Sequence, residues 1–213
     1  MNRTDFDKDR ERHIVIAREV IRNEARALEE AAAAIGADFV DAVEAMARCT
    51  GQIVCCGVGK SGHVAAKIAS MLSSTGTPSS FLNSAEALHG DLGGLRKGDI
   101  VLAVSHSGEN PELLAVLPLF KRFDVEIVAI TDNAGSTLAL VSNITLLGGK
   151  TAEADPISLA PTASAAAALA IGDALALAIA QHRGYSVADF EHHPGGALGK
   201  LMESVYNREG GRS

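Results

Sequence analysis

The segment Gly57-Val-Gly-Lys-Ser-Gly62 combines the residue types that proteins use to bind phosphate. An apolar, β-branched run, Ile53–Cys56, comes before it, and apolar residues at helical spacing follow it from His63 to Leu72. A strand, a glycine turn and a helix N-terminus present free backbone N–H groups and a positive dipole end to an anion. Lys60 adds a positive charge to these donors. The expected phosphate contacts are Gly59, Ser61 and Gly62.

Two familiar glycine motifs were compared with this segment. A P-loop requires a glycine five residues before the Gly-Lys-Ser, and Val54 occupies that position. The dinucleotide pattern G-x-G-x-x-G is present, but it also expects an acid about 20 residues further on, at the end of the next strand. That strand ends in Asn83, and the nearest acid, Glu86, comes three residues later. A nicotinamide cofactor is therefore disfavoured, and no cofactor is predicted.

A second polar segment, Ser105-His-Ser-Gly-Glu-Asn110, follows the apolar run Ile100–Val104. Asn110 suits a helix N-cap and Pro111 the first helical position, so a second helix N-terminus is expected beside the first. A capped turn without a ligand would use the same residue types. Two such turns at the ends of neighbouring strands favour a phosphate ligand. The expected contacts here are Ser105, His106, Ser107, Gly108 and Asn110.

Strands and helices alternate along the rest of the chain. Near-continuous apolar strands such as Ile100–Val104 and Ile127–Ile130 indicate a parallel sheet that is buried on both faces. The pattern predicts a doubly wound three-layer α/β/α sandwich with a five-stranded parallel sheet, whose ligands lie at the carboxyl ends of the strands. The expected strands are Ile53–Cys56, Ser79–Leu82, Asp99–Ser105, Val125–Thr131 and Ile144–Leu147. The expected helices between them are Ser61–Ser74, Ser84–Leu88, Pro111–Phe123 and Ser136–Val141.

Three regions are expected. Residues 1–50 form helices, Asp9–Ile35 and Asp38–Cys49, that pack on the core or on a partner subunit. Residues 51–203 form the α/β domain, and residues 204–213 form a frayed tail. The apolar stretch Leu159–Ala180 contains Asp173 and is expected to be a buried or subunit-packing helix, not a membrane span.

Composition narrows the possible partners. The 213-residue chain has a net charge of −7, and its pI near 5.5 argues against nucleic acid or an anionic membrane. Its three cysteines, Cys49, Cys55 and Cys56, offer no disulfide framework, which favours a cytoplasmic protein. No metal-ligand spacing is present, so no metal is predicted.

Six segments stand in the order found in sugar-isomerase (SIS) domains, and together they resemble the arabinose-5-phosphate isomerases of the lipopolysaccharide (Kdo) pathway. The resemblance covers about residues 10 to 201 and implies a flavodoxin-like fold, a homotetramer and no organic cofactor. It also implies interconversion of D-ribulose 5-phosphate and D-arabinose 5-phosphate. The segments are Gly57–His63, Leu88–Gly93, Ser105–Asn110, Leu159–Thr162, Gly172–Leu175 and His193–Gly199.

The resemblance also implies the working residues. Aldose–ketose isomerisation through an enediol needs a base at carbon, an acid–base group at the oxygens and a cation for developing negative charge. Lys60 suits the cation, while Glu112, Glu153 and His193 all remain candidates for the carbon base. His89 is expected in the pocket, and Thr162 among the substrate contacts.

Longer members of this family continue into a pair of CBS domains, whereas the present sequence ends at Ser213. An isomerase without CBS-mediated control is therefore expected. Asn110 stands where the family usually has serine or threonine, and Asp155 replaces a common cysteine, so an isomerase of another sugar phosphate stays open. A non-catalytic domain that binds a sugar phosphate or nucleotide sugar is the other alternative.

Overall fold

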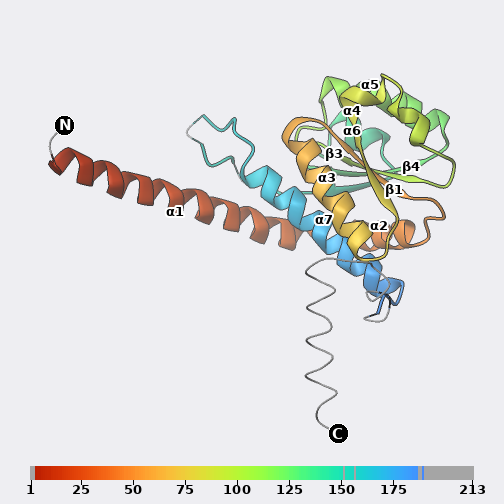
Figure 1. The fold of residues 1–213 in the computed structure, drawn as a ribbon, viewed down its shortest axis with the longest axis horizontal. Coiled ribbons are helices and arrows are strands. Elements are labelled where there is room, and N and C mark those ends of the chain that lie inside the picture. Colours follow the sequence, from red (N-terminus) through yellow and green to blue (C-terminus); the bar gives the residue numbers. More distant parts are fainter. Residues whose placement is uncertain (1–2, 151, 156, 187–188, 190–213) are drawn as a thin grey trace, which may run out of the picture.

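The computed structural model describes residues 3–150, 152–155, 157–186 and 189. Five parallel strands form one sheet in the order β2-β1-β3-β4-β5 (Figure 1). This is the flavodoxin-like order: β2 is added on one side of β1, and β3, β4 and β5 are added on the other side. The predicted fold class is confirmed. The strands are β1 Ile53–Gly57, β2 Ser79–Asn83, β3 Ile100–Val104, β4 Glu126–Thr131 and β5 Ile144–Leu147.

Helices cover both faces of the sheet. On one face α2 (Ala37–Ala47), α3 (Gly59–Ser74) and α7 (Ala163–His182) pack together, and on the other face lie three further helices. Successive residues of β1 alternate between the two cores: Ile53 and Cys55 face α3 and α7, whereas Val54 and Cys56 face the other layer. The helices of that layer are α4 Ser84–Ala87, α5 Pro111–Arg122 and α6 Thr137–Val141, and a 3₁₀ turn, η1, spans Asp91–Gly94.

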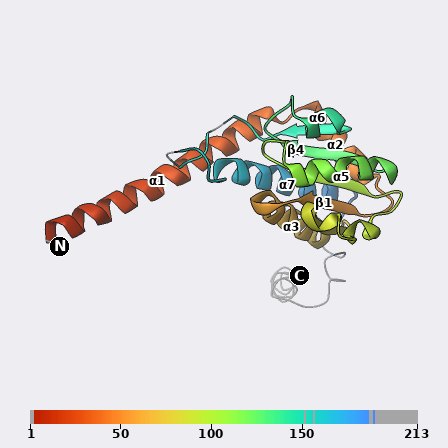
Figure 2. The ribbon, with the colours of Figure 1, turned by 90° about the horizontal axis from the view of Figure 1, so that it is seen from above.

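The helix α1, Arg3–Ala34, extends well beyond the domain (Figures 1 and 2). Its C-terminal half packs on α7, where Ala27 and Ala31 are buried. The predicted helix started at Asp9, and the structure places its start at Arg3. The six added residues, Arg3–Lys8, include Arg and Lys, which are good helix formers, and contain no Gly or Pro that would end a helix.

The apolar helix α7 is long and apolar enough to cross a membrane by length and composition alone. In the structure, however, its residues Ile171, Leu175 and Ile179 are buried against the helices around it. It therefore serves as a core helix of the domain. It starts at Ala163, later than the predicted Leu159, because the preceding loop is fixed by contacts described below.

The helices α3 and α7 approach each other closely at Gly172. A Cβ atom on this residue would lie 2.3 Å from the Cδ1 and Cγ1 atoms of Ile68, well inside the contact distance. We expect Gly172→Leu to lower the free energy of unfolding by about 1–3 kcal/mol, because the added side chain overpacks this contact. Ala174→Leu, on the exposed side of the same helix, is the matched control and should change it by less than about 0.5 kcal/mol. Urea unfolding followed by circular dichroism tests this, and equal stabilities would contradict the described packing.

Candidate functional site

Two adjoining pockets lie at the carboxyl ends of the strands. The first is bounded by the start of α3, the ends of β3 and β4, and the start of α7. The second lies beside it, is also lined by Gly149 and Ala152, and shares His106 and Asp132 with the first. Polar side chains of the first pocket are Lys60, Ser61, His106, Thr131, Asp132 and Ser164. The second adds Lys150, Glu153 and Ser158.

The first turn of α3, which follows β1, presents Lys60 and Ser61 to the first pocket. Gly59 has a φ of +60°, which favours glycine, and α3 begins at this residue instead of the predicted Ser61. Gly62 is buried in the first turn. Lys60 is therefore a first-turn residue of a 16-residue helix, at the positive end of the helix dipole, where an anion is favoured.

The second predicted phosphate segment forms a self-capped turn. Ser105 Oγ accepts a hydrogen bond from the Gly108 N–H (3.2 Å), and Ser107 Oγ accepts one from the Glu109 N–H (3.2 Å). Asn110 Oδ1 caps α5 by accepting from the amides of Glu112 and Leu113 (3.1 and 3.3 Å). Four backbone donors of this turn are thus used internally.

Of the residues of that turn, only His106 lines the two pockets. His106 enters both pockets, whereas Ser107, Gly108, Asn110 and Glu112 are not among the residues that line them. Glu112 is exposed in the first turn of α5. The predicted catalytic carboxylate Glu112 and the predicted cation Lys60 are therefore not brought together in the described pockets.

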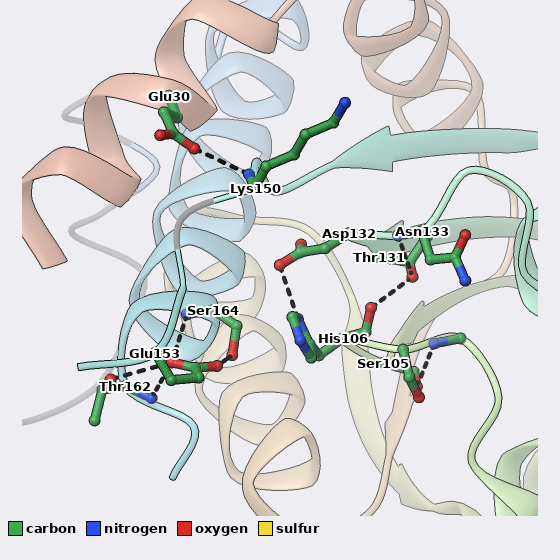
Figure 3. Close-up of polar contacts among 12 residues, drawn as sticks. Glu30, Ser105, His106, Thr131, Asp132, Asn133, Lys150, Glu153, Thr162 and Ser164 are labelled. Atoms are coloured by element: carbon green, nitrogen blue, oxygen red, sulfur yellow. Dashed lines mark hydrogen bonds and ion pairs between the residues drawn. The ribbon is translucent and has the colours of Figure 1, made fainter. Parts of the chain in front are cut away.

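His106 is held by Thr131, the last residue of β4, and by Asp132, which follows it (Figure 3). Its Nδ1 lies 2.8 Å from Asp132 Oδ2, and its backbone oxygen accepts from the Asp132 N–H and from Thr131 Oγ1, each at 3.0 Å. The hydrogen bond to Asp132 raises the pKa of His106 above its ordinary value. Partial burial opposes this rise, and the negative charges of Asp132 and Glu153 add to it.

Glu153 is fixed at the start of α7 (Figure 3). Its Oε2 accepts hydrogen bonds from the Thr162 N–H (2.8 Å), Thr162 Oγ1 (3.1 Å) and the Ser164 N–H (3.4 Å), and its Oε1 accepts from Ser164 Oγ. Thr162 makes no side-chain cap of its own, so Glu153 supplies the cap from nine residues upstream. Desolvation raises the pKa of Glu153, but the hydrogen bonds from Ser164 and Thr162 outweigh it and leave the pKa below its ordinary value.

The segment that carries Glu153 is also tied to α1. Glu30 Oε2 accepts from the Lys150 N–H (2.9 Å), and Asn23 Nδ2 donates to the Ala152 oxygen (3.1 Å; Figure 3 shows the Glu30 contact). Two residues of α1 thereby hold the wall of the second pocket. The long N-terminal helix positions this wall as well as packing on α7.

The remaining predicted residues lie away from these pockets or outside the described structure. His89 is exposed in the turn between α4 and η1 and does not line either pocket. His193 lies outside the described residues. Within the described ranges, no group of three His, Cys, Asp or Glu side chains is placed to hold a metal ion. Sequence reasoning missed Asp132 and Ser164, although the position of Asp132 directly after β4 was a usable signal.

Cys55 and Cys56 lie near the end of β1, just before the chain enters α3. Burial raises the pKa of both thiols, that of Cys56 to about 12. A thiol is a nucleophile only as the thiolate, so neither Cys55 nor Cys56 is suited to covalent catalysis near neutral pH.

The cap of α7 gives a pH dependence that can be measured. Because the pKa of Glu153 is lowered by folding, its contribution to stability is present above the ordinary pKa of 4.5 and is lost as the pH falls through the folded value. We expect Glu153→Gln to cost about 1 kcal/mol at neutral pH and to cost less at about pH 3.5. Glu126→Gln, an exposed carboxylate on β4, is the control. The measurement is the free energy of unfolding of the wild type and the two variants across this pH range. Equal values for Glu153→Gln and Glu126→Gln would contradict the cap.

Comparison with known proteins gives relatives over most of the chain. The arabinose 5-phosphate isomerase KdsD of Pseudomonas aeruginosa is 46% identical over 187 residues, and that of Escherichia coli K12 is 44% identical over 186 residues. Each alignment covers 87% of this chain and 57% of the relative, so the chain spans little more than half the length of these relatives. A solved structure of E. coli CFT073 c3406 in complex with arabinose 5-phosphate superimposes with a TM-score of 0.82 at 37% identity, covering 91% of this chain and 100% of that one.

The SIS domain family model matches residues 46–178, which contain the whole sheet, both pockets and most of α7. That range is more than half of the 213 residues. The resemblance expected from the six sequence segments is confirmed, and the chain belongs to the SIS domain family.

Proposed function

We propose that the protein is an aldose–ketose isomerase that interconverts D-ribulose 5-phosphate and D-arabinose 5-phosphate through an enediol. The observation that carries the proposal is the site: Lys60, His106 and Glu153 meet in adjoining pockets at the carboxyl ends of the strands. Relatives that are 44–46% identical over this region are arabinose 5-phosphate isomerases. The solved structure that is 37% identical is a complex with arabinose 5-phosphate.

The chemistry of the pocket supports this reaction. Removing a proton from C1 of the ketose leaves negative charge on the carbonyl oxygen, and a fixed cation stabilises that charge. Lys60 lines the pocket beside the N-terminus of α3, where the helix dipole has the same sign as the ammonium group. Lys60 is proposed to hold an anionic oxygen of the substrate, and Ser61 to donate a hydrogen bond beside it.

The carbon base is one of Glu112, Glu153 and His193. Glu153 lines the second pocket, and its carboxylate already accepts four hydrogen bonds, which weakens it as a base. Glu112 is exposed outside the described pockets, and His193 lies outside the described residues. Substitution of the true carbon base must abolish exchange of the substrate C–H proton with solvent. One measurement of this exchange can therefore rank variants of the three residues.

The decisive experiment is proton NMR of the protein with D-ribulose 5-phosphate in deuterated buffer. We expect signals of arabinose 5-phosphate that carries deuterium at C2, because the enediol is reprotonated from solvent. Lys60→Met should reduce kcat about 100-fold, the loss typical for one oxyanion donor, whereas Lys121→Met on the exposed surface of α5 should not. Glu112→Gln, Glu153→Gln and His193→Ala then identify the base by loss of exchange.

Unchanged ribulose 5-phosphate, with no exchange at C1, would refute the assignment. Turnover of another ketose phosphate under the same conditions would replace the substrate and keep the reaction class. Binding of sugar phosphates without any exchange would favour the non-catalytic alternative.

The proposal includes a homotetramer located in the cytoplasm. Support for assembly comes from α1, on which Ile14, Ile21 and Leu28 follow at seven-residue spacing with 52%, 66% and 40% of their surface exposed. This spacing places them along one stripe of the helix, next to the face that packs on α7. Exposed large apolar side chains in a row are typical of a surface that another subunit covers. The free cysteines Cys49, Cys55 and Cys56 are compatible with a reducing compartment.

Light scattering after size exclusion tests the assembly. We expect the combined change Ile14→Lys and Ile21→Lys to give a smaller species than the wild type, because two charges are placed in the apolar stripe. Arg12→Lys with Glu19→Lys, on another exposed face of α1, should keep the wild-type mass. A wild-type mass of one protomer would refute the tetramer, and an unchanged mass in the isoleucine variant would refute the role of this stripe.

A further inference from the structure

His106 is fixed more completely than a residue in an exposed turn needs to be. Its backbone oxygen accepts two hydrogen bonds, from the Asp132 N–H and from Thr131 Oγ1, and its ring is hydrogen-bonded to Asp132 Oδ2. Thr131 is almost fully buried, with 1% of its surface exposed. Main chain and ring are therefore both anchored to the end of β4 and to Asp132, although 53% of the His106 side chain is exposed.

The contact with Asp132 determines which ring nitrogen carries a proton. A carboxylate only accepts hydrogen bonds, so Nδ1 must be the protonated nitrogen whenever His106 is neutral. Nε2 is then the nitrogen that gains and loses a proton. Among the described residues, no second hydrogen bond engages the ring. A histidine fixed at one nitrogen and free at the other has the arrangement of an acid–base group.

The charged groups that share the pockets with His106 come from three other elements. Lys60 belongs to α3, Asp132 follows β4, and Lys150 and Glu153 belong to the segment before α7. The carboxylate of Glu153 already accepts four hydrogen bonds, and Lys60 has the role of the cation in the proposed reaction. His106 is thus the pocket residue suited to exchange a proton near neutral pH.

We propose that His106 is the acid–base residue at the substrate oxygens of the isomerisation, with Asp132 as its positioning residue. The inference rests on the proposed isomerase activity and deepens it. It differs from the expectation that His106 only contacts substrate. It also assigns a role to Asp132, which follows from the structure alone.

The proton transfers balance with His106 in this role. As the carbon base takes a proton from C1 of the ketose, the imidazolium gives its Nε2 proton to the oxygen on C2, and a neutral enediol forms. The base then returns its proton to C2, while His106 Nε2 takes the proton from the oxygen on C1, and the aldehyde forms. Both protein groups end in their starting states, and no oxidant or reductant is needed.

The test combines activity with direct observation of the ring. The imidazolium form of His106 donates the proton in the first step of the forward and of the reverse reaction. Activity should therefore fall as the pH rises above the pKa of His106. We expect His106→Gln to reduce kcat about 100-fold or more with a smaller effect on KM, and to remove this alkaline limb of the profile. Asp132→Asn should reduce kcat about 10-fold and move the limb to lower pH, since the charge that favours the imidazolium is lost. Asp132→Glu should restore part of the activity.

Nitrogen-15 NMR of labelled histidines measures the tautomer and the titration of the His106 ring in the absence of substrate. The His106→Gln variant assigns the signals. Wild-type protein should show the Nδ1–H tautomer, and Asp132→Asn should lower the pKa of His106. Asn133→Ala, at the next and exposed residue, is the matched control and should change neither the ring titration nor kcat.

The outcomes separate this proposal from the proposed function. An active wild type whose His106→Gln variant changes only KM, with the alkaline limb unchanged, would overturn the acid–base role. A His106 pKa that is the same in Asp132→Asn would overturn the role of Asp132, whatever the activity. A wild type that leaves every ketose phosphate unchanged would refute the isomerase, and the catalytic role of His106 with it, while the titration would still decide whether Asp132 controls the ring.

Discussion

The close packing around Gly57 is the constraint on which the site depends. A Cβ atom at this position would lie 3.0 Å from the Ser61 oxygen and 3.1 Å from the Val104 oxygen, so any side chain here would crowd the backbone where the end of β1 meets the first turn of α3 and the end of β3. β1 and β3 are paired in parallel register from Ile53 and Ile100 onward, which brings their carboxyl ends to the same edge. Since the strand order reverses between these two strands, the chain leaves them toward opposite layers. The crevice at this edge is the first pocket, which is bounded by the start of α3, the ends of β3 and β4 and the start of α7.

The opposite wall of the crevice is built by long-range polar contacts. Glu153 caps α7 through Thr162 and Ser164, and α1 holds the same segment through Glu30 and Asn23. A polar surface segment such as this one buries little apolar area. Its position is therefore fixed by hydrogen bonds to helices and strands. The carboxylate that family resemblance places in the catalytic set therefore has a structural task, and its variants need stability measurements beside their kinetics.

The regular elements could be predicted because their signals are local. Apolar runs such as Ile100–Val104 and caps such as Asn110 with Pro111 each lie within a few residues, and the structure has β3 and α5 there. The partnerships of the site depend on contacts between distant residues. His106 and Asp132 are 26 positions apart, and Glu153 and Ser164 are 11 apart. Residue type alone also could not tell that the amides of Gly108 and Glu109 are used by Ser105 and Ser107, because a capped turn and a phosphate turn share one composition.

Two carboxylates in the same pockets have opposite consequences for proton transfer. Glu153 accepts hydrogen bonds from amide and hydroxyl groups, which do not titrate. These bonds stabilise the ionised form of Glu153, so its pKa falls. Asp132 instead shares its hydrogen bond with a titratable ring, so the stabilisation goes to the imidazolium and the pKa of His106 rises. The hydrogen-bond partner of each carboxylate, more than its burial, decides its role. Glu153 fixes the pocket wall at the start of α7, and Asp132 raises the pKa of His106. A pocket that contains one of each can keep its shape while one of its groups changes charge.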